Sequence, residues 1–289
     1  MPHLNVNGVN LHYQQSGQGP DVVLIHAFTS NMAIWMLTGL IEHLAAEFRV
    51  TAYDLRGHGV SEVPPTGYTS ADMVQDLAEL HAALGLGPAY LVGHSFGGVV
   101  ALHAAAEHPE MAAGVIVSDT YFPGLKDIEP NIADTAIWQE LRQDLEKAGV
   151  SIGSKVDFGR LFQIVADFTP EEVEAIKGVM GASATRWLSH LARLAGTTAG
   201  EDIFQTAGFT EARIRSVAVP VVGLYDEETT FAATCRFLKQ NLPDCRLDTV
   251  AGARHIAPLQ NSAEFARLVK HHLEEMESRR LEPKTKVDG

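Results

Sequence analysis

The residue best suited to covalent chemistry is Ser95, which lies at the centre of the sequence GHSFG at residues 93–97. An apolar strand pattern precedes this motif, and an Ala-rich helical pattern follows it from Val99. A serine on a sharp strand-to-helix turn projects its hydroxyl group away from the backbone, and the flanking glycines permit the turn. The start of the helix also favours negative charge nearby. We therefore predict that Ser95 is a nucleophile; the alternative is a glycine-rich turn that only joins the two elements.

A serine hydroxyl needs a base, and His255 is the best-placed histidine. It lies in a loop with Gly252, after a strand pattern at residues 246–250. Open α/β sheets place their chemistry in loops at the carboxyl edge of the strands. The alternative for a single loop histidine is a solvated surface residue. Histidines within helical patterns are expected to be surface or packing residues: His103, His108, His271 and His272.

Short apolar runs recur along the chain and are typical of strands buried on both faces. Helical patterns alternate with them, the clearest from Ser70 to Leu84 with Ser70 as its cap. This alternation predicts an α/β protein with a doubly wound, mostly parallel sheet. Asn7-Gly8 predicts a hairpin turn near the start. The expected strands are residues 22–25, 49–53, 89–92, 115–117, 219–225 and 246–250.

The alternation stops after Asp119, and only helical patterns occur before Val217. Thr169 followed by Pro170 is a typical helix start. We predict three parts: an α/β core of residues 1–120 and 217–275, an all-helical cap of residues 121–216, and a flexible, charged tail of residues 276–289.

The composition is that of a globular protein, since 46% of the 289 residues are hydrophobic and 20% are charged. The net charge of −14, without a cluster of Lys or Arg, argues against nucleic acid as a partner. No run of about 18 apolar residues exists, so we expect no membrane span. The first residues lack the pattern of a secretory signal, and two cysteines give no disulfide framework. We expect a cytoplasmic protein without cofactor or metal, and leave a homodimer open.

Three further segments make the chain resemble the α/β-hydrolase-fold family over nearly its whole length. Residues 26–28 follow the first buried strand, where the family usually has His-Gly and then an oxyanion-hole residue; here Ala27 replaces the glycine. Residues 54–61 match the family's Asp-x-Arg-Gly-x-Gly-x-Ser segment, and residues 252–255 match its histidine loop. We expect His26 and residues 54–61 to be structural.

The resemblance implies an oxyanion hole formed by the backbone N–H groups of Phe28 and Phe96. Two such donors stabilise the charge of a tetrahedral intermediate, typically by ~3 kcal/mol each. The alternative is that Phe28 and Phe96 only form apolar walls.

The acid that should orient the histidine is missing from the family's commonest position. In the family pattern Pro-x-x-x-x-x-Gly-x-x-Asp, counted here from Pro220, the aspartate position holds Thr229. A threonine cannot stabilise an imidazolium as a carboxylate does. We predict that Asp119, which follows the strand at residues 115–117, replaces it, because a triad is set by geometry. The alternative is a structural role for Asp119, with the acid supplied by a nearby carboxylate: Asp226, Glu227 or Glu228.

Two subfamilies with the acid after this earlier strand are similar to the chain. The (acetamidomethylene)succinate hydrolases are similar at residues 26–31, 56–59 and 66–68. The cofactor-free quinolone dioxygenases share the displaced acid, but they have histidine where this chain has Phe96 and lack the histidine at position 26. Both differences favour hydrolysis.

The expected function is therefore a serine hydrolase that cleaves an ester, amide or similar small-molecule substrate through an acyl-enzyme. The alternatives are a cofactor-free ring-cleaving dioxygenase, which would use the His255–Asp119 pair as base, and a non-catalytic ligand receptor of the same fold. Five aromatic residues of the cap have two alternative roles, lining the substrate site or packing between cap helices: Tyr121, Trp138, Phe162, Phe168 and Trp187. Three cap cations either pair with a substrate carboxylate or lie exposed: Arg186, His190 and Arg193.

Overall fold

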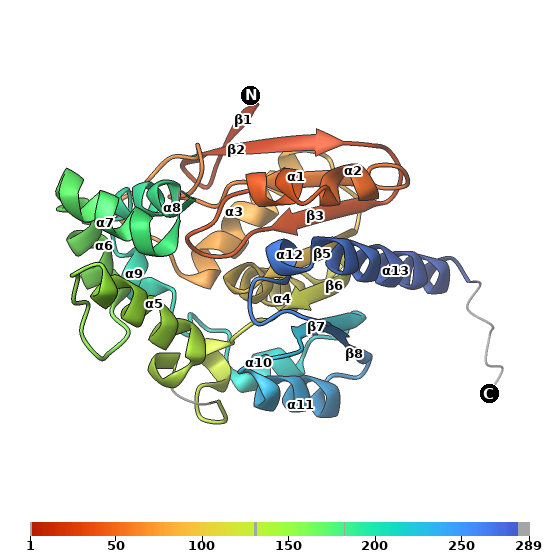
Figure 1. Cartoon of the computed structure of the whole chain (residues 1–289). Helices are drawn as coiled ribbons and strands as arrows, with labels where there is room; N and C mark the ends of the chain where they lie inside the picture. The colour runs from red at the N-terminus through yellow and green to blue at the C-terminus, as the bar shows by residue number, and fades with distance from the viewer. Residues whose placement is uncertain (1, 130–131, 182, 283–289) are drawn as a thin grey trace.

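The computed structural model describes residues 2–129, 132–181 and 183–282, without the side chains of residues 133, 136, 137, 183, 185 and 186. Its centre is an eight-stranded sheet of order β1-β2-β4-β3-β5-β6-β7-β8 (Figure 1). β1 and β2 are antiparallel additions at one edge, and β3 to β8 run parallel to one another. The predicted doubly wound, mostly parallel sheet is therefore confirmed. The strands are β1 (His3–Val6), β2 (Val9–Ser16), β3 (Asp21–Ile25), β4 (Arg49–Tyr53), β5 (Ala89–His94), β6 (Ala112–Ser118), β7 (Val221–Asp226) and β8 (Cys245–Val250).

Helices cover both faces of the sheet, so the central strands are buried along their whole length and are mostly apolar. One face packs against α1 (Ala33–Leu37), α2 (Leu40–Leu44), α12 (Ala257–Gln260) and α13 (Ser262–Leu281). The other face packs against α3 (Ser70–Ala83), α4 (Phe96–Glu107), α10 (Glu211–Arg215) and α11 (Ala232–Asn241). The short helix η1 (Pro109–Met111) joins α4 to β6.

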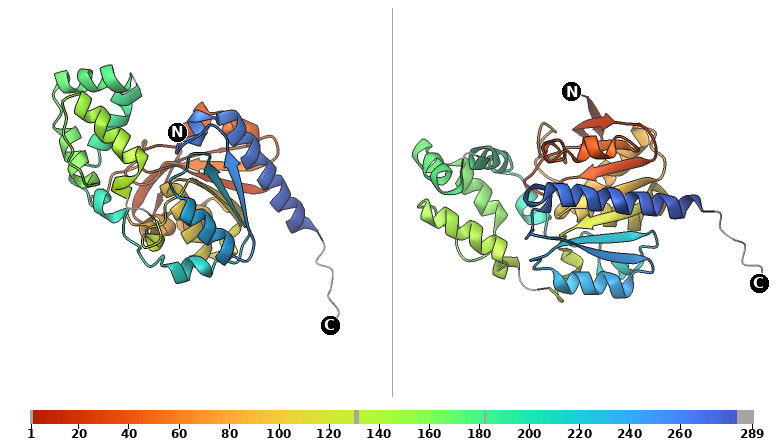
Figure 2. Two further views of the ribbon diagram at one scale, coloured as in Figure 1. Left: turned by 60° about the horizontal axis from the view of Figure 1, so that its bottom comes forward. Right: turned by 45° about the vertical axis from the view of Figure 1, so that its right-hand side comes forward.

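Between β6 and β7 the described residues contain helices and loops but no strand. Both views of Figure 2 show α5 to α8 standing together at one end of the sheet, as a helical cap. Thr169 and Glu172 form the reciprocal capping box that starts α7, as the Thr-Pro pattern predicts. The segment contains η2 (Pro123–Leu125), η3 (Ile132–Asp134), α5 (Ala136–Lys147), α6 (Phe158–Ala166), α7 (Pro170–Met180), α8 (Ser183–Ala192), α9 (Ala199–Asp202) and α10.

The last helix extends further than the sequence predicts. We expected a flexible tail from residue 276, but α13 continues to Leu281. Met276 is buried in the core, and the Tyr90 hydroxyl donates a 2.7 Å hydrogen bond to Glu277 Oε2. These tertiary contacts hold a charged sequence in a helix that its composition alone does not indicate. In the part of the chain that the structure describes, no helix has the length and apolar character needed to cross a membrane.

Candidate active site

Ser95 lies on a strained turn between β5 and α4. Its backbone has φ +52° and ψ −120°, a conformation that side-chain-bearing residues rarely adopt. A Cβ atom at Gly93 would lie 2.1 Å from the Gly97 carbonyl oxygen, and one at Gly97 would lie 2.2 Å from the Ile25 carbonyl oxygen. Both glycines are therefore required for the turn, and tight packing there maintains the strain at Ser95.

The His255 ring is bound by Asp119. Nδ1 of His255 lies 2.7 Å from Oδ2 of Asp119, which follows β6 and is fully buried. Because a carboxylate only accepts hydrogen bonds, Nδ1 donates, and Nε2 of His255 is left to accept a proton. The Asp119 side chain is itself fixed, since its Oδ1 accepts the backbone N–H of Asp226 at 3.3 Å.

The loop that carries His255 is held on both sides of this residue. Nε2 of the buried His94 donates a 2.7 Å hydrogen bond to the His255 carbonyl oxygen. Burial and the neighbouring His255 lower the pKa of His94 to about 4. On the other side, Oδ2 of Asp226 accepts the backbone N–H of Ala257 at 3.2 Å. His255 is therefore positioned through its backbone as well as through its ring.

The other candidate acids have different partners. Asp226 is buried at the end of β7, and its carboxyl group contacts the backbone of the histidine loop but not the His255 ring. Burial and the adjacent Asp119 raise the pKa of Asp226 to about 7. Oε2 of Glu227 accepts the Gly252 N–H, and Glu228, with 68% of its side chain exposed, pairs with Arg254. Among the described carboxylates, Asp119 is the one hydrogen-bonded to the His255 ring.

Phe28 and Phe96 are placed at neighbouring strand ends, with their rings 5.9 Å apart. Phe96 is the first residue of α4, so its amide has no acceptor within the helix. In the described residues no acceptor is recorded for the Phe28 amide either. Neither amide therefore has a described backbone acceptor, and both residues line the cavity next to Ser95.

The loop that carries Phe28 rests on buried histidines. Nδ1 of His26 donates to the Ala27 carbonyl oxygen at 2.8 Å, and its Nε2 accepts the Leu55 N–H at 3.0 Å. His58 Nε2 accepts the Thr29 N–H, and burial together with His26 lowers the pKa of His58 to about 3. His26 and residues 54–61 thus support the loop beneath the site.

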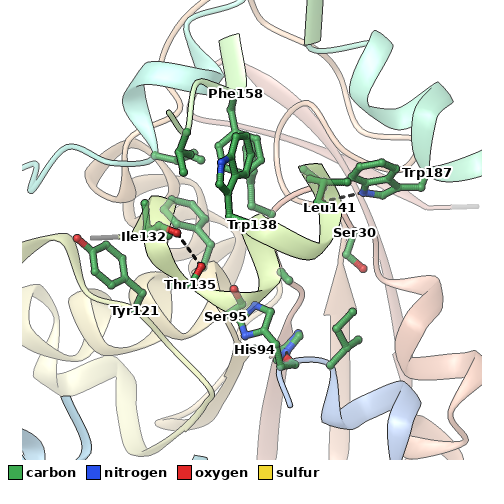
Figure 3. Close-up of a pocket in the computed structure, with 18 of the residues that line it drawn as sticks. Ser30, His94, Ser95, Tyr121, Ile132, Thr135, Trp138, Leu141, Phe158 and Trp187 are labelled. Carbon is green, nitrogen blue, oxygen red and sulfur yellow. Dashed lines mark hydrogen bonds between the residues drawn. The ribbon is translucent and has the colours of Figure 1, made fainter. Parts of the chain in front are cut away.

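A cavity of about 590 Å³ lies between the strand ends and the cap, and both Ser95 and His255 line it. Figure 3 shows Ser95 and His94 on one side of it and Trp138 and Phe158 on the other. Of the five cap aromatics named from the sequence, three line the cavity: Tyr121, Trp138 and Trp187. Phe162 is fully buried, and Phe168 packs against the core without reaching the cavity.

Comparison with known proteins agrees with this fold. The family model of the alpha/beta hydrolase fold matches residues 20–158, which include the Ser95 turn. The chain has the α/β-hydrolase fold.

Relatives of this α/β-hydrolase-fold protein carry the names of hydrolases. It is 36% identical to the 2-(acetamidomethylene)succinate hydrolase of Mesorhizobium japonicum over 116 residues, a match that spans 40% of this chain and 41% of that protein. It is 29% identical to the pimeloyl-[acyl-carrier protein] methyl ester esterase of Chromobacterium violaceum, over 92% of this chain and 99% of that protein. The solved enol-lactonase of Burkholderia xenovorans shares the fold, with a TM-score of 0.69 and 24% identity over 94% of this chain and 100% of that one.

Of the three cap cations named from the sequence, the two whose side chains are described lie outside the wall of the cavity. Arg193 donates to the backbone carbonyl oxygens of Gly59 and Ser61, in the core. His190 Nε2 lies 3.1 Å from Nδ2 of Asn31, and neither His190 nor Arg193 lines the cavity. The side chain of Arg186 lies outside the described residues.

Sequence reasoning missed several cavity residues. Phe231 follows β7 and contacts the His255 ring edge-on at 6.0 Å, so its place after a strand end was a usable signal. Phe158 and Phe204 come from the cap, where spacing along the chain does not indicate which aromatic faces the core. Met180 at the end of α7 was likewise missed.

Proposed function

We propose that this protein is a serine hydrolase that cleaves an ester, amide or similar carbonyl substrate with Ser95, His255 and Asp119. The observation that carries the proposal is the 2.7 Å hydrogen bond from the His255 ring to the buried Asp119, at a cavity that Ser95 also lines. The strained backbone of Ser95 supports it as well, because such strain is concentrated at functional sites.

In this mechanism the Ser95 oxygen attacks the substrate carbonyl carbon while Nε2 of His255 takes the serine proton. Asp119 stabilises the imidazolium and keeps its ring oriented. The amides of Phe28 and Phe96 bind the oxyanion, typically contributing ~3 kcal/mol each. His255 then gives the proton to the leaving group and activates a water molecule, which releases the acyl group from Ser95.

A fluorophosphonate probe and p-nitrophenyl esters test this proposal. We expect the probe to modify wild-type protein once, as seen by intact-mass spectrometry, and not to modify Ser95→Ala. Ser95→Ala and His255→Ala should both lose ester turnover. The matched control is Ser151→Ala, which removes an exposed serine outside the cavity and should be labelled like the wild type. Full turnover by Ser95→Ala would contradict the proposal, and oxygen consumption that requires His255 but not Ser95 would favour the dioxygenase alternative.

A further inference from the structure

The part of the active-site cavity wall that the structure describes holds no carboxylate, ammonium or guanidinium group. None of the described residues that line it is Asp, Glu, Lys or Arg. Two histidines also line it, but burial lowers the pKa of His94 to about 4, and the His255 ring is paired with the Asp119 carboxylate, so this pair adds no net positive charge. The cavity therefore offers no described cation to an anionic substrate group.

Two described arginines of this part of the molecule have partners outside the cavity. Arg254 precedes His255 but pairs with Glu140 at 2.7 Å and with Glu228 at 3.3 Å. Arg193 binds backbone carbonyl oxygens of the core. Moreover, the carboxyl group of Asp119 is buried behind His255, and the whole chain carries a net charge of −14. Both the local and the long-range fields repel an anion.

Aromatic rings form much of the cap side of the cavity. Phe158 stacks on Phe204 at 5.6 Å and meets the edge of Trp138 at the same distance. Such rings contribute a large apolar area and pair well with a further ring. A volume of about 590 Å³ lies within the range of roughly 300–1,000 Å³ that is typical of small-molecule sites.

We propose that the substrates are neutral carbonyl compounds with apolar, ring-bearing or long aliphatic groups, and that the site rejects substrates with a free carboxylate. This inference rests on the proposed serine-hydrolase function. A carboxylate that enters the cavity loses its hydration and meets no cation on the described part of the wall, which is strongly unfavourable. The relative named 2-(acetamidomethylene)succinate hydrolase has a succinate in its name, and a succinate carries carboxylates. The substrates proposed here differ from such a compound because they are neutral.

A pair of substrates that differ in one charge tests the inference. The mono-p-nitrophenyl ester of adipic acid carries a free carboxylate, and its methyl ester is neutral. Since only the carboxylate has to be buried without a cation, we expect kcat/KM for the methyl-capped substrate to be about 100-fold higher. Equal values, or a preference for the free acid, would overturn the inference.

Introducing a cation into the wall should weaken this discrimination. Met180 lines the cavity and is half-buried, so Met180→Lys replaces one long flexible side chain with another that carries charge. We expect the ratio between the two substrates to fall about tenfold in Met180→Lys. Val179→Lys is the matched control, because Val179 is 39% exposed and does not line the cavity. An unchanged ratio in an active Met180→Lys variant would contradict the inference.

Binding to Ser95→Ala separates this inference from the proposed function. Quenching of the fluorescence of Trp138 and Trp187 reports binding of both adipate esters without turnover. Tighter binding of the neutral ester supports the inference even if wild-type protein hydrolyses neither. Tighter binding of the free acid would overturn it, and loss of that preference in Arg186→Ala would assign carboxylate recognition to Arg186.

Discussion

Two neighbouring strands, β6 and β7, each end in a buried aspartate, and the two aspartates serve His255 in different ways. Asp119 after β6 binds the ring at Nδ1, whereas Asp226 at the end of β7 binds the backbone N–H of Ala257. His94 also holds the backbone, through the His255 carbonyl oxygen. Contact with the ring can control its proton, while contact with the backbone only controls where the loop lies. Burial and position at a strand end therefore do not by themselves assign the acid of a triad.

Loss of the ring contact should have the largest effect. Asp119→Asn keeps the size of the side chain but favours the wrong tautomer of His255, so we expect kcat to fall about 10⁴-fold. Steady-state kinetics with a p-nitrophenyl ester measure this, and circular dichroism checks that the fold is retained. A folded Asp119→Asn variant with a loss below about tenfold would contradict the role proposed for Asp119.

Loss of a backbone contact should have an intermediate effect. His94→Ala removes the donor to the His255 carbonyl oxygen and frees the loop to shift, which we expect to lower kcat about 10- to 100-fold. His94→Gln supplies another N–H donor and should recover much of the loss. If the alanine and glutamine variants were equally impaired, the hydrogen bond would not be what positions His255.

Asp226→Asn should have the smallest effect on turnover. The amide oxygen can still accept the Ala257 N–H, so we expect kcat to stay within about threefold of wild type at neutral pH. A loss as large as that of Asp119→Asn, measured under the same conditions, would remove the distinction between the two aspartates.

The same substitution should change how stability depends on pH. The pKa of Asp226 is raised from its ordinary value of 3.8 to about 7 by burial and Asp119, so between these values the folded chain holds a proton that the unfolded chain has lost. Stability then falls as pH rises through this window. Asp226→Asn has no group that titrates there, so it should not show this fall in stability. The difference between its melting temperature and that of wild type should therefore increase from pH 4 to pH 8, by ~2–4 °C for each kcal/mol of difference in the free energy of unfolding. The exposed Asp167→Asn is the control and should follow the wild-type curve.

The sequence predicts the core strands and the positions of Ser95 and His255 in the fold well, because these depend on local patterns. The nearby glycines and the change from a strand pattern to a helix pattern indicate the Ser95 turn. The position of His255 after the last strand indicates the histidine loop. Asp119 is indicated only indirectly, by the threonine at position 229. That Asp119 lies next to His255 depends on the pairing of β6, β7 and β8, which brings together residues 136 positions apart.

The cavity wall could not be predicted in the same way. Phe158 and Phe162 lie one helical turn apart in α6, yet the first lines the cavity and the second is fully buried. Which ring faces the substrate depends on how the cap helices pack, a tertiary property without a local signature. Arg193 likewise binds carbonyl oxygens more than a hundred residues away, in a core loop.

The chain leaves the sheet for the cap and re-enters it at adjoining strands, since Ser118 of β6 pairs directly with Leu224 of β7. The helical segment is thus inserted between two strands that pair directly with each other. A change in this segment can therefore alter the cap side of the cavity without shifting the strand ends that position Ser95 and Asp119.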